Sequence, residues 1–208
     1  HTGRGCISNR AAMTRGRYLL VLCFMLMPVP ASAHSFIPGA GSFVNGLVHP
    51  FVIPAHVIGI IMLGMFVGQH GSQVMKWSLA SFMLSLLAGL LVTMIWPWQS
   101  IYIVILVACM LLGLAVAIAR QVPLTWLLAI VAIVGFMLGL DSPQPELAGR
   151  ERMAALFGTL LGCFFSLVYI AALTEIVTRP WLKIGVRVLG SWGAASALMV
   201  LALTMVGG

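Results

Sequence analysis

The sequence predicts an all-α polytopic membrane protein with six transmembrane helices that follow a cleavable signal peptide. Of its 208 residues, 62% are hydrophobic and only 7% are charged, whereas a soluble domain carries about 25% charged residues. The mean hydropathy is +1.12. The apolar residues also form runs long enough for helices that cross a bilayer, and short polar connections separate these runs.

Two amino-terminal segments are set apart from the folded domain. Residues 1–12 precede the first methionine and resemble upstream or tag-derived sequence. Residues 13–33 have the organisation of a signal peptide, with a charged start, an apolar core and small residues before the cut. The apolar core is short for a membrane span, although a retained additional helix is the alternative. Cleavage after Ala33 would leave a transmembrane domain of residues 34–208.

Six apolar runs predict the spans, after an exported Gly/Pro/Ser-rich segment at residues 34–45. The runs cover residues 51–68, 77–95, 101–119, 124–140, 153–173 and 184–206. If the mature amino terminus is periplasmic, the cytoplasmic side holds Lys76, Arg120, Arg179, Lys183 and Arg187. The exported side then holds only Arg150 and Arg152 among basic residues after the signal peptide. Because cytoplasmic loops are enriched in Lys and Arg, this orientation in a bacterial inner membrane is favoured.

Small residues at helical spacing predict close packing of the spans. Three glycine pairs are four residues apart: Gly64 and Gly68, Gly135 and Gly139, and Gly158 and Gly162. Glycines at this spacing let helix backbones approach each other in lipid. Cys109 and Cys163 lie in the middle of apolar runs, so they do not predict a disulfide framework.

Several classes of function are excluded by what the sequence lacks. The basic residues are scattered at the ends of segments and form no patch with exposed aromatics, which argues against nucleic acid as a partner. No Ser–His pair, paired intramembrane carboxylates or zinc-protease signature occupies the spans, so we do not expect an enzyme. No ATP-binding motif is present, so any transport would be passive or ion-coupled.

Three of the five histidines surround the first predicted span. His49, His56 and His70 are separated by seven and fourteen residues. On an unbroken helix they would form one stripe that rises roughly 31 Å, about the thickness of the hydrocarbon layer. Pro50 and Pro54 leave an alternative open, because a proline can kink the helix or mark its start.

The histidines are the candidate metal ligands, because imidazole binds nickel, cobalt, zinc and copper. An amino-terminal His34 would offer both an amine and an imidazole. His49 and His56 would lie about 10 Å apart along an unbroken helix, so they need a break in the helix to share one ion. We therefore expect a site formed by His34, His49 and His56. Each of them also has a structural interpretation, as a solvated end, an interfacial group or a satisfied polar contact.

At these residues the sequence resembles the HupE/UreJ family of hydrogenase and urease accessory proteins, which are regarded as nickel or cobalt permeases. The family's first span carries His, five residues, Asp and His; here both histidines are present, but Ala55 replaces the carboxylate. A second family motif reads Phe-His-Gly-x-Ala/Val-His-Gly-x-Glu. We place it at residues 156–164, where the glycines match. Three apolar residues then stand at its ligand positions: Phe157, Leu161 and Phe164.

The resemblance implies a secondary permease for a divalent transition-metal ion, nickel or cobalt, with the ion as cargo and no permanently bound cofactor. Its partners would be the lipid bilayer and the ion. A family tied to hydrogenase and urease also implies a metalloenzyme-maturation protein or further copies of the chain as partners. Cys163, next to the missing carboxylate, is a weaker candidate for a substitute ligand. The alternative is a non-transporting assembly protein that kept the family fold and lost the metal pathway.

Overall fold

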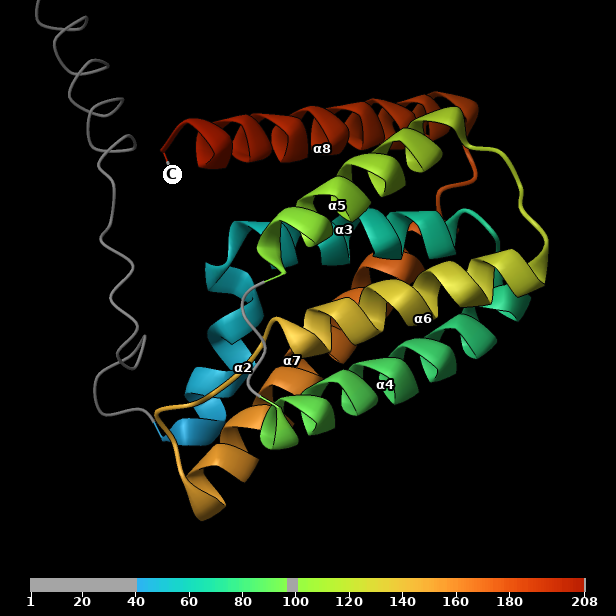
Figure 1. Cartoon of the computed structure of the whole chain (residues 1–208). Helices are drawn as coiled ribbons and strands as arrows, with labels where there is room; N and C mark the ends of the chain where they lie inside the picture. Colours follow the sequence, from blue (N-terminus) through green and yellow to red (C-terminus); the bar gives the residue numbers. More distant parts are fainter. Residues whose placement is uncertain (1–40, 97–100, 208) are drawn as a thin grey trace, which may run out of the picture. The chain divides into compact units, whose positions relative to one another are not determined.

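The computed structural model describes residues 41–96 and 101–207, and within this part the chain is entirely helical (Figure 1). The predicted signal peptide, His34 and residues 97–100, between the second and third predicted spans, lie outside the described residues. The described helices are α2 (Ser42–Val52), α3 (Pro54–Gly68), α4 (Ser72–Ile95), α5 (Tyr102–Ile118), α6 (Leu124–Leu140), α7 (Gly149–Glu175) and α8 (Pro180–Gly207).

The first predicted span is a pair of helices rather than one. α2 begins at Ser42, inside the segment expected to be an exported loop, and the axes of α2 and α3 bend by 76° at Ile53. Pro54 is the cause, because the residue before a proline is pushed out of the helical region, and Ile53 is extended with φ −94° and ψ 113°. The prediction of one helix over 51–68 is therefore wrong, and so is the unbroken histidine stripe, whereas the alternative that Pro54 marks the start of a helix is confirmed.

The helices are those of a membrane protein. α4, α7 and α8 are each long and apolar enough to cross a bilayer, and the bent pair α2–α3 counts as a fourth candidate span. α5 and α6 are apolar but have 17 residues each, at the lower limit for a span. Length and composition thus support three or four spans in the described part of the chain.

Glycines set the distances between the helices, as predicted. α4 packs on α6 where a Cβ added at Gly139 would lie 2.8 Å from the Leu90 nitrogen. α2 packs on α7 where a Cβ added at Gly158 would lie 2.8 Å from the Leu47 nitrogen. α3 is the central helix, because it contacts all six of the other described helices.

A threonine hydroxyl of α7 donates a hydrogen bond to a backbone carbonyl of α2. Pro50 lies inside α2 and has no N–H, so the carbonyl of Gly46, four residues earlier, loses its helical donor. The buried Thr159 Oγ1 lies 3.1 Å from this carbonyl oxygen and 3.1 Å from the Ala155 carbonyl of its own helix, so the two acceptors share its one hydrogen. α2 therefore keeps its helical path past Pro50 because α7 supplies the missing hydrogen bond.

We expect Thr159→Val, which keeps the shape but removes the hydroxyl, to destabilise the protein by about 1–2 kcal/mol, because the Gly46 carbonyl loses the donor that α7 supplies. Denaturant unfolding in detergent would measure this loss. Thr204→Val is the matched control, since Thr204 is exposed and bonds only carbonyls of its own helix. An equal loss of unfolding free energy in the two variants would contradict a stabilising role for the Thr159–Gly46 hydrogen bond.

Candidate functional site

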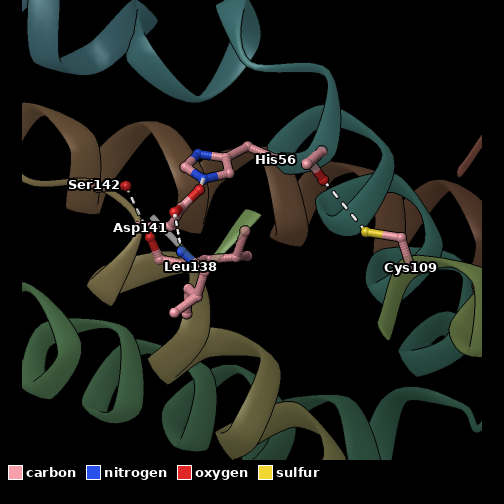
Figure 2. A network of polar contacts seen from close by, with 7 residues as sticks. His56, Cys109, Leu138, Asp141 and Ser142 are labelled. Atoms are coloured by element: carbon pink, nitrogen blue, oxygen red, sulfur yellow. Dashed lines mark hydrogen bonds and ion pairs between the residues drawn. The ribbon is translucent and has the colours of Figure 1, made fainter. Parts of the chain in front are cut away.

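The centre of the candidate site is His56, three residues into α3. Its side chain is completely buried. Its Nε2 lies 3.1 Å from Oδ2 of Asp141, the residue that follows the last turn of α6 (Figure 2). The other carboxylate oxygen of Asp141 accepts a hydrogen bond of 3.1 Å from the backbone N–H of Ile101, directly before α5. One carboxylate thus joins the start of α3, the start of α5 and the end of α6.

The break between α2 and α3 brings a second histidine to this centre. His49 lies in α2 and is only 9% exposed. The ring centroids of His49 and His56 are 5.9 Å apart, with the rings nearly edge to face at 69°. On an unbroken helix the two residues would be separated by about 10 Å of rise. The two histidines can share one ion only if the helix is broken between them. The structure has this break at Pro54 and not at Pro50.

The carboxylate determines which nitrogen of His56 faces the remaining space. An ionised carboxylate only accepts hydrogen bonds, so a neutral His56 donates Nε2–H to Asp141 and keeps a lone pair on Nδ1. His56 Nδ1 is buried and has no hydrogen-bond partner among the described residues. A carboxylate that holds one nitrogen of a histidine while the other binds an ion is the usual arrangement in metal sites.

The other two histidines after the predicted signal peptide are His34 and His70. His34 lies outside the described residues. His70 lies in the turn after α3, where its Nδ1 is 2.7 Å from the Phe66 carbonyl and its Nε2 accepts from the Val122 N–H at 3.2 Å. Both bonds are made by one neutral tautomer. His70 therefore has a structural role at the end of α3 opposite His56.

The thiols do not join the site. Cys109 and Cys163 are free and buried. Cys109 donates to the Ala55 carbonyl at 3.3 Å (Figure 2). Within residues 41–96 and 101–207, no three His, Cys, Asp or Glu side chains are already arranged around a common point as metal ligands. The described site is therefore two imidazoles and one carboxylate in contact, and not a closed coordination sphere.

Asp141 is a candidate site residue that the sequence alone did not single out. The apolar run predicted at 124–140 leaves Asp141 in the connection that follows it, yet Asp141 is the C-cap residue of α6 and is only 9% exposed. A signal was present, because Gly135, Gly139 and Asp141 have the spacing of Gly-x-x-x-Gly-x-Glu in the second family motif. The contact between Asp141 and His56 makes residues 133–141 the better counterpart of this motif. The ligand positions of its two histidines are then Val134 and Leu138.

The earlier placement of the second motif at residues 156–164 is accordingly replaced. Gly158 and Gly162 do face α2, so the prediction of close packing there is confirmed. Phe157, however, is 55% exposed and contacts Phe43 at a ring-centroid distance of 6.2 Å. Phe157, Leu161 and Phe164 lie along one face of α7, beside the glycines rather than among the buried polar groups. Phe157, Leu161 and Phe164 are therefore no evidence that the chain has lost the carboxylate of the second family motif.

Comparison with known proteins supports one assignment. A family model described as HupE / UreJ protein matches residues 22–203, which is most of the chain. Neither the curated proteins nor the solved structures give a match. The matched region contains both histidines, Asp141 and all seven described helices up to the last turns of α8. The chain therefore belongs to the HupE/UreJ family, a family of transport and accessory proteins rather than of enzymes.

Proposed function

We propose that this protein is a secondary permease for a divalent transition-metal ion, nickel or cobalt, and that His49 and His56 bind the ion during entry. The observation that carries the proposal is the buried cluster of His49, His56 and Asp141. Ionisable groups inside a membrane are costly and mark ion pathways more often than they stabilise a fold. Borderline metals such as nickel and cobalt are suited to imidazole ligands.

In this mechanism the ion exchanges its water for protein donors at the end of the bundle where α2 meets α3. His56 offers its Nδ1 lone pair, the nearby ring of His49 can turn its own nitrogen toward the same ion, and Asp141 supplies negative charge. The amine and imidazole of His34 would complete the donor set if the signal peptide is removed after Ala33. A site that is open before loading suits a transporter, because the ion must also leave.

The proposed topology has six spans in a bacterial inner membrane, with the bent pair α2–α3 as the first and the 17-residue helices α5 and α6 included. The mature amino terminus and the histidine cluster would then face the periplasm. Five basic residues lie at the other end, which we call the basic end: Lys76, Arg120, Arg179, Lys183 and Arg187. Their position is what the positive-inside rule expects of a cytoplasmic face.

Ion uptake tests the proposal directly. In cells that lack other importers, we expect the wild type to accumulate radioactive nickel or cobalt and the double variant His49→Ala/His56→Ala to fall to the level of the empty vector. His70→Ala is the matched control, because His70 is bonded at the opposite end of α3 and should keep most of the uptake. Unchanged uptake in the double variant would refute the site.

An assembly protein without transport is the second candidate, and one observation favours it. The two positions that carry histidines in the second family motif are filled by Val134 and Leu138, which are 5% and 0% exposed in the core. The protein would then be a membrane partner in metalloenzyme maturation. Titration of the purified protein separates the two candidates: saturable nickel binding favours the permease, whereas its absence together with a co-purified maturation protein favours the assembly role.

A further inference from the structure

A cavity lined by both polar and apolar groups lies at the basic end, next to His70 and far from His49 and His56. Its volume is about 290 Å³, it is open to one side, and it is lined by the ends of α3, α5 and α7 and the start of α8. The polar side chains that line it are Gln69, Gln121, Thr174, Glu175, Lys183 and Arg187. Gln69 is the thirteenth residue after His56 along α3, so the two are separated by a rise of roughly 20 Å along the helix axis. The cavity is therefore not part of the proposed entry site.

The charges of the lining select against a cation. Lys183 and Arg187 are one turn apart on α8, and Glu175 is the only acid among the lining residues. Arg187 donates its Nε–H to the Ala117 carbonyl at 2.8 Å, which fixes the guanidinium to the end of α5 and leaves its terminal N–H groups for a ligand. Two adjacent basic side chains of this kind match a phosphate group.

The cavity also contains hydrogen-bond acceptors. Gln69 donates its Nε2–H to the Val116 carbonyl at 3.1 Å, and its Oε1 is buried without a hydrogen-bond partner among the described residues. The half-buried carboxylate of Glu175 lies in the same lining. A ligand that fits must therefore carry hydrogen-bond donors in addition to its phosphate.

An apolar surface leads from the cavity toward the middle of the membrane. α8 packs on α5 and α3, and α7 packs on α2, α3 and α4, so α7 and α8 diverge after the turn that joins them (Figure 1). On α3, Gly64 and Gly68 contact α7 and Met62 contacts Gly193 of α8. Helical periodicity places Ile58, Ile61 and Met65 between these two contact faces, in line with Gln69, and all three are partly buried.

We infer that this cavity is a phospholipid site. The phosphate binds Lys183 and Arg187, donor groups of the headgroup bind Gln69 Oε1 and Glu175, and an acyl chain lies on Ile58, Ile61 and Met65. Basic pockets between transmembrane helices on the cytoplasmic side are suited to lipid headgroups. Phosphatidylglycerol, with one negative charge and two hydroxyl donors, has the required chemistry. Phosphatidylcholine has a phosphate but no donor on its headgroup.

The test measures binding of phosphatidylglycerol to the purified full-length protein in a neutral detergent, by native mass spectrometry at increasing lipid concentration. We expect saturable binding that is weakened about 30-fold in Lys183→Gln/Arg187→Gln, the change for two lost basic contacts. Lys183→Gln alone, which leaves the Arg187–Ala117 bond intact, should weaken binding about fivefold. The control Lys76→Gln/Arg179→Gln removes the same charge from exposed residues outside the cavity and should bind as the wild type does.

Three results would overturn the inference. One is equal weakening in the control, which would show attraction to the whole basic end. Another is equal, variant-insensitive binding of phosphatidylcholine, which would show an ordinary lipid annulus. The third is complete displacement of the lipid by millimolar inorganic phosphate, which would make the ligand a free phosphate. None of these results depends on metal transport, so the inference and the proposed permease can fail separately.

Discussion

Replacing Asp141 with Asn is expected to lower the affinity for nickel or cobalt about 10- to 100-fold, the usual cost of losing the carboxylate behind a ligating histidine. Asp141 accepts hydrogen bonds from both His56 and the Ile101 N–H. Asn has only one oxygen, so if that oxygen stays on Ile101 its NH₂ group faces His56 Nε2. His56 would then accept at Nε2 and carry its proton on Nδ1, where the ion should bind.

The measurement pairs metal titration with the ¹⁵N chemical shifts of the His56 ring. We expect the wild type to show an unprotonated Nδ1 and the Asn variant to show the opposite tautomer with weakened binding. Glu151→Gln is the control, since Glu151 is exposed at the same end of the bundle. If Asp141→Asn changes the tautomer but not the affinity, Asp141 positions His56 without serving the ion. If it changes neither, the role assigned to Asp141 is wrong.

A bulky residue at Gly158 is expected to unfold the contact between α2 and α7, at a cost of about 3 kcal/mol or more. A Cβ at this position would collide with the Phe43 carbonyl oxygen and lie 2.8 Å from the Leu47 nitrogen. Both of these atoms belong to backbone, which cannot rotate away as a side chain could. Gly158→Leu should therefore separate α7 from α2, and with it displace His49.

Thermal unfolding and the yield of monodisperse protein in detergent would measure this effect. Gly185→Leu is the matched control, because a Cβ at Gly185 meets no atom within 4 Å and the position lies on an exposed face of α8. We expect Gly185→Leu to unfold within a few degrees of the wild type. A comparable loss in both variants would mean that bulk at any helical glycine is harmful, and that the α2–α7 contact is not specific.

Composition and periodicity predicted the class of fold and the positions of most helices. The runs expected at 124–140 and 77–95 correspond to α6 and to most of α4. The start of the first helix was missed because it contains weak helix formers: Ser42, Asn45, Gly46 and Pro50. Their helix is stabilised instead by packing of Gly46 on Ala155 and by the Thr159 hydroxyl. Such tertiary contacts leave no local pattern.

The candidate site was predicted in part, for a related reason. The residue types and the spacing of His49 and His56 marked them as candidate ligands, and Pro54 was recognised as a possible break. Asp141 lies 85 residues from His56, so no periodicity connects the two. The matching glycine spacing at Gly135 and Gly139 was available, but Gly158 and Gly162 have the same spacing. The acid two residues after Gly139 distinguishes the two glycine pairs in the sequence, and its contact with His56 supports that choice.

The shortness of α5 and α6 has a consequence for the surrounding lipid. A helix of 17 residues is about 26 Å long, several Å less than the typical hydrocarbon layer of about 30 Å. A bilayer responds to such hydrophobic mismatch by thinning locally, at a fraction of a kcal/mol for each Å. If α5 and α6 span the membrane, as the proposed topology requires, the hydrocarbon layer that opposes the passage of a charged ion would be thinnest around these two helices.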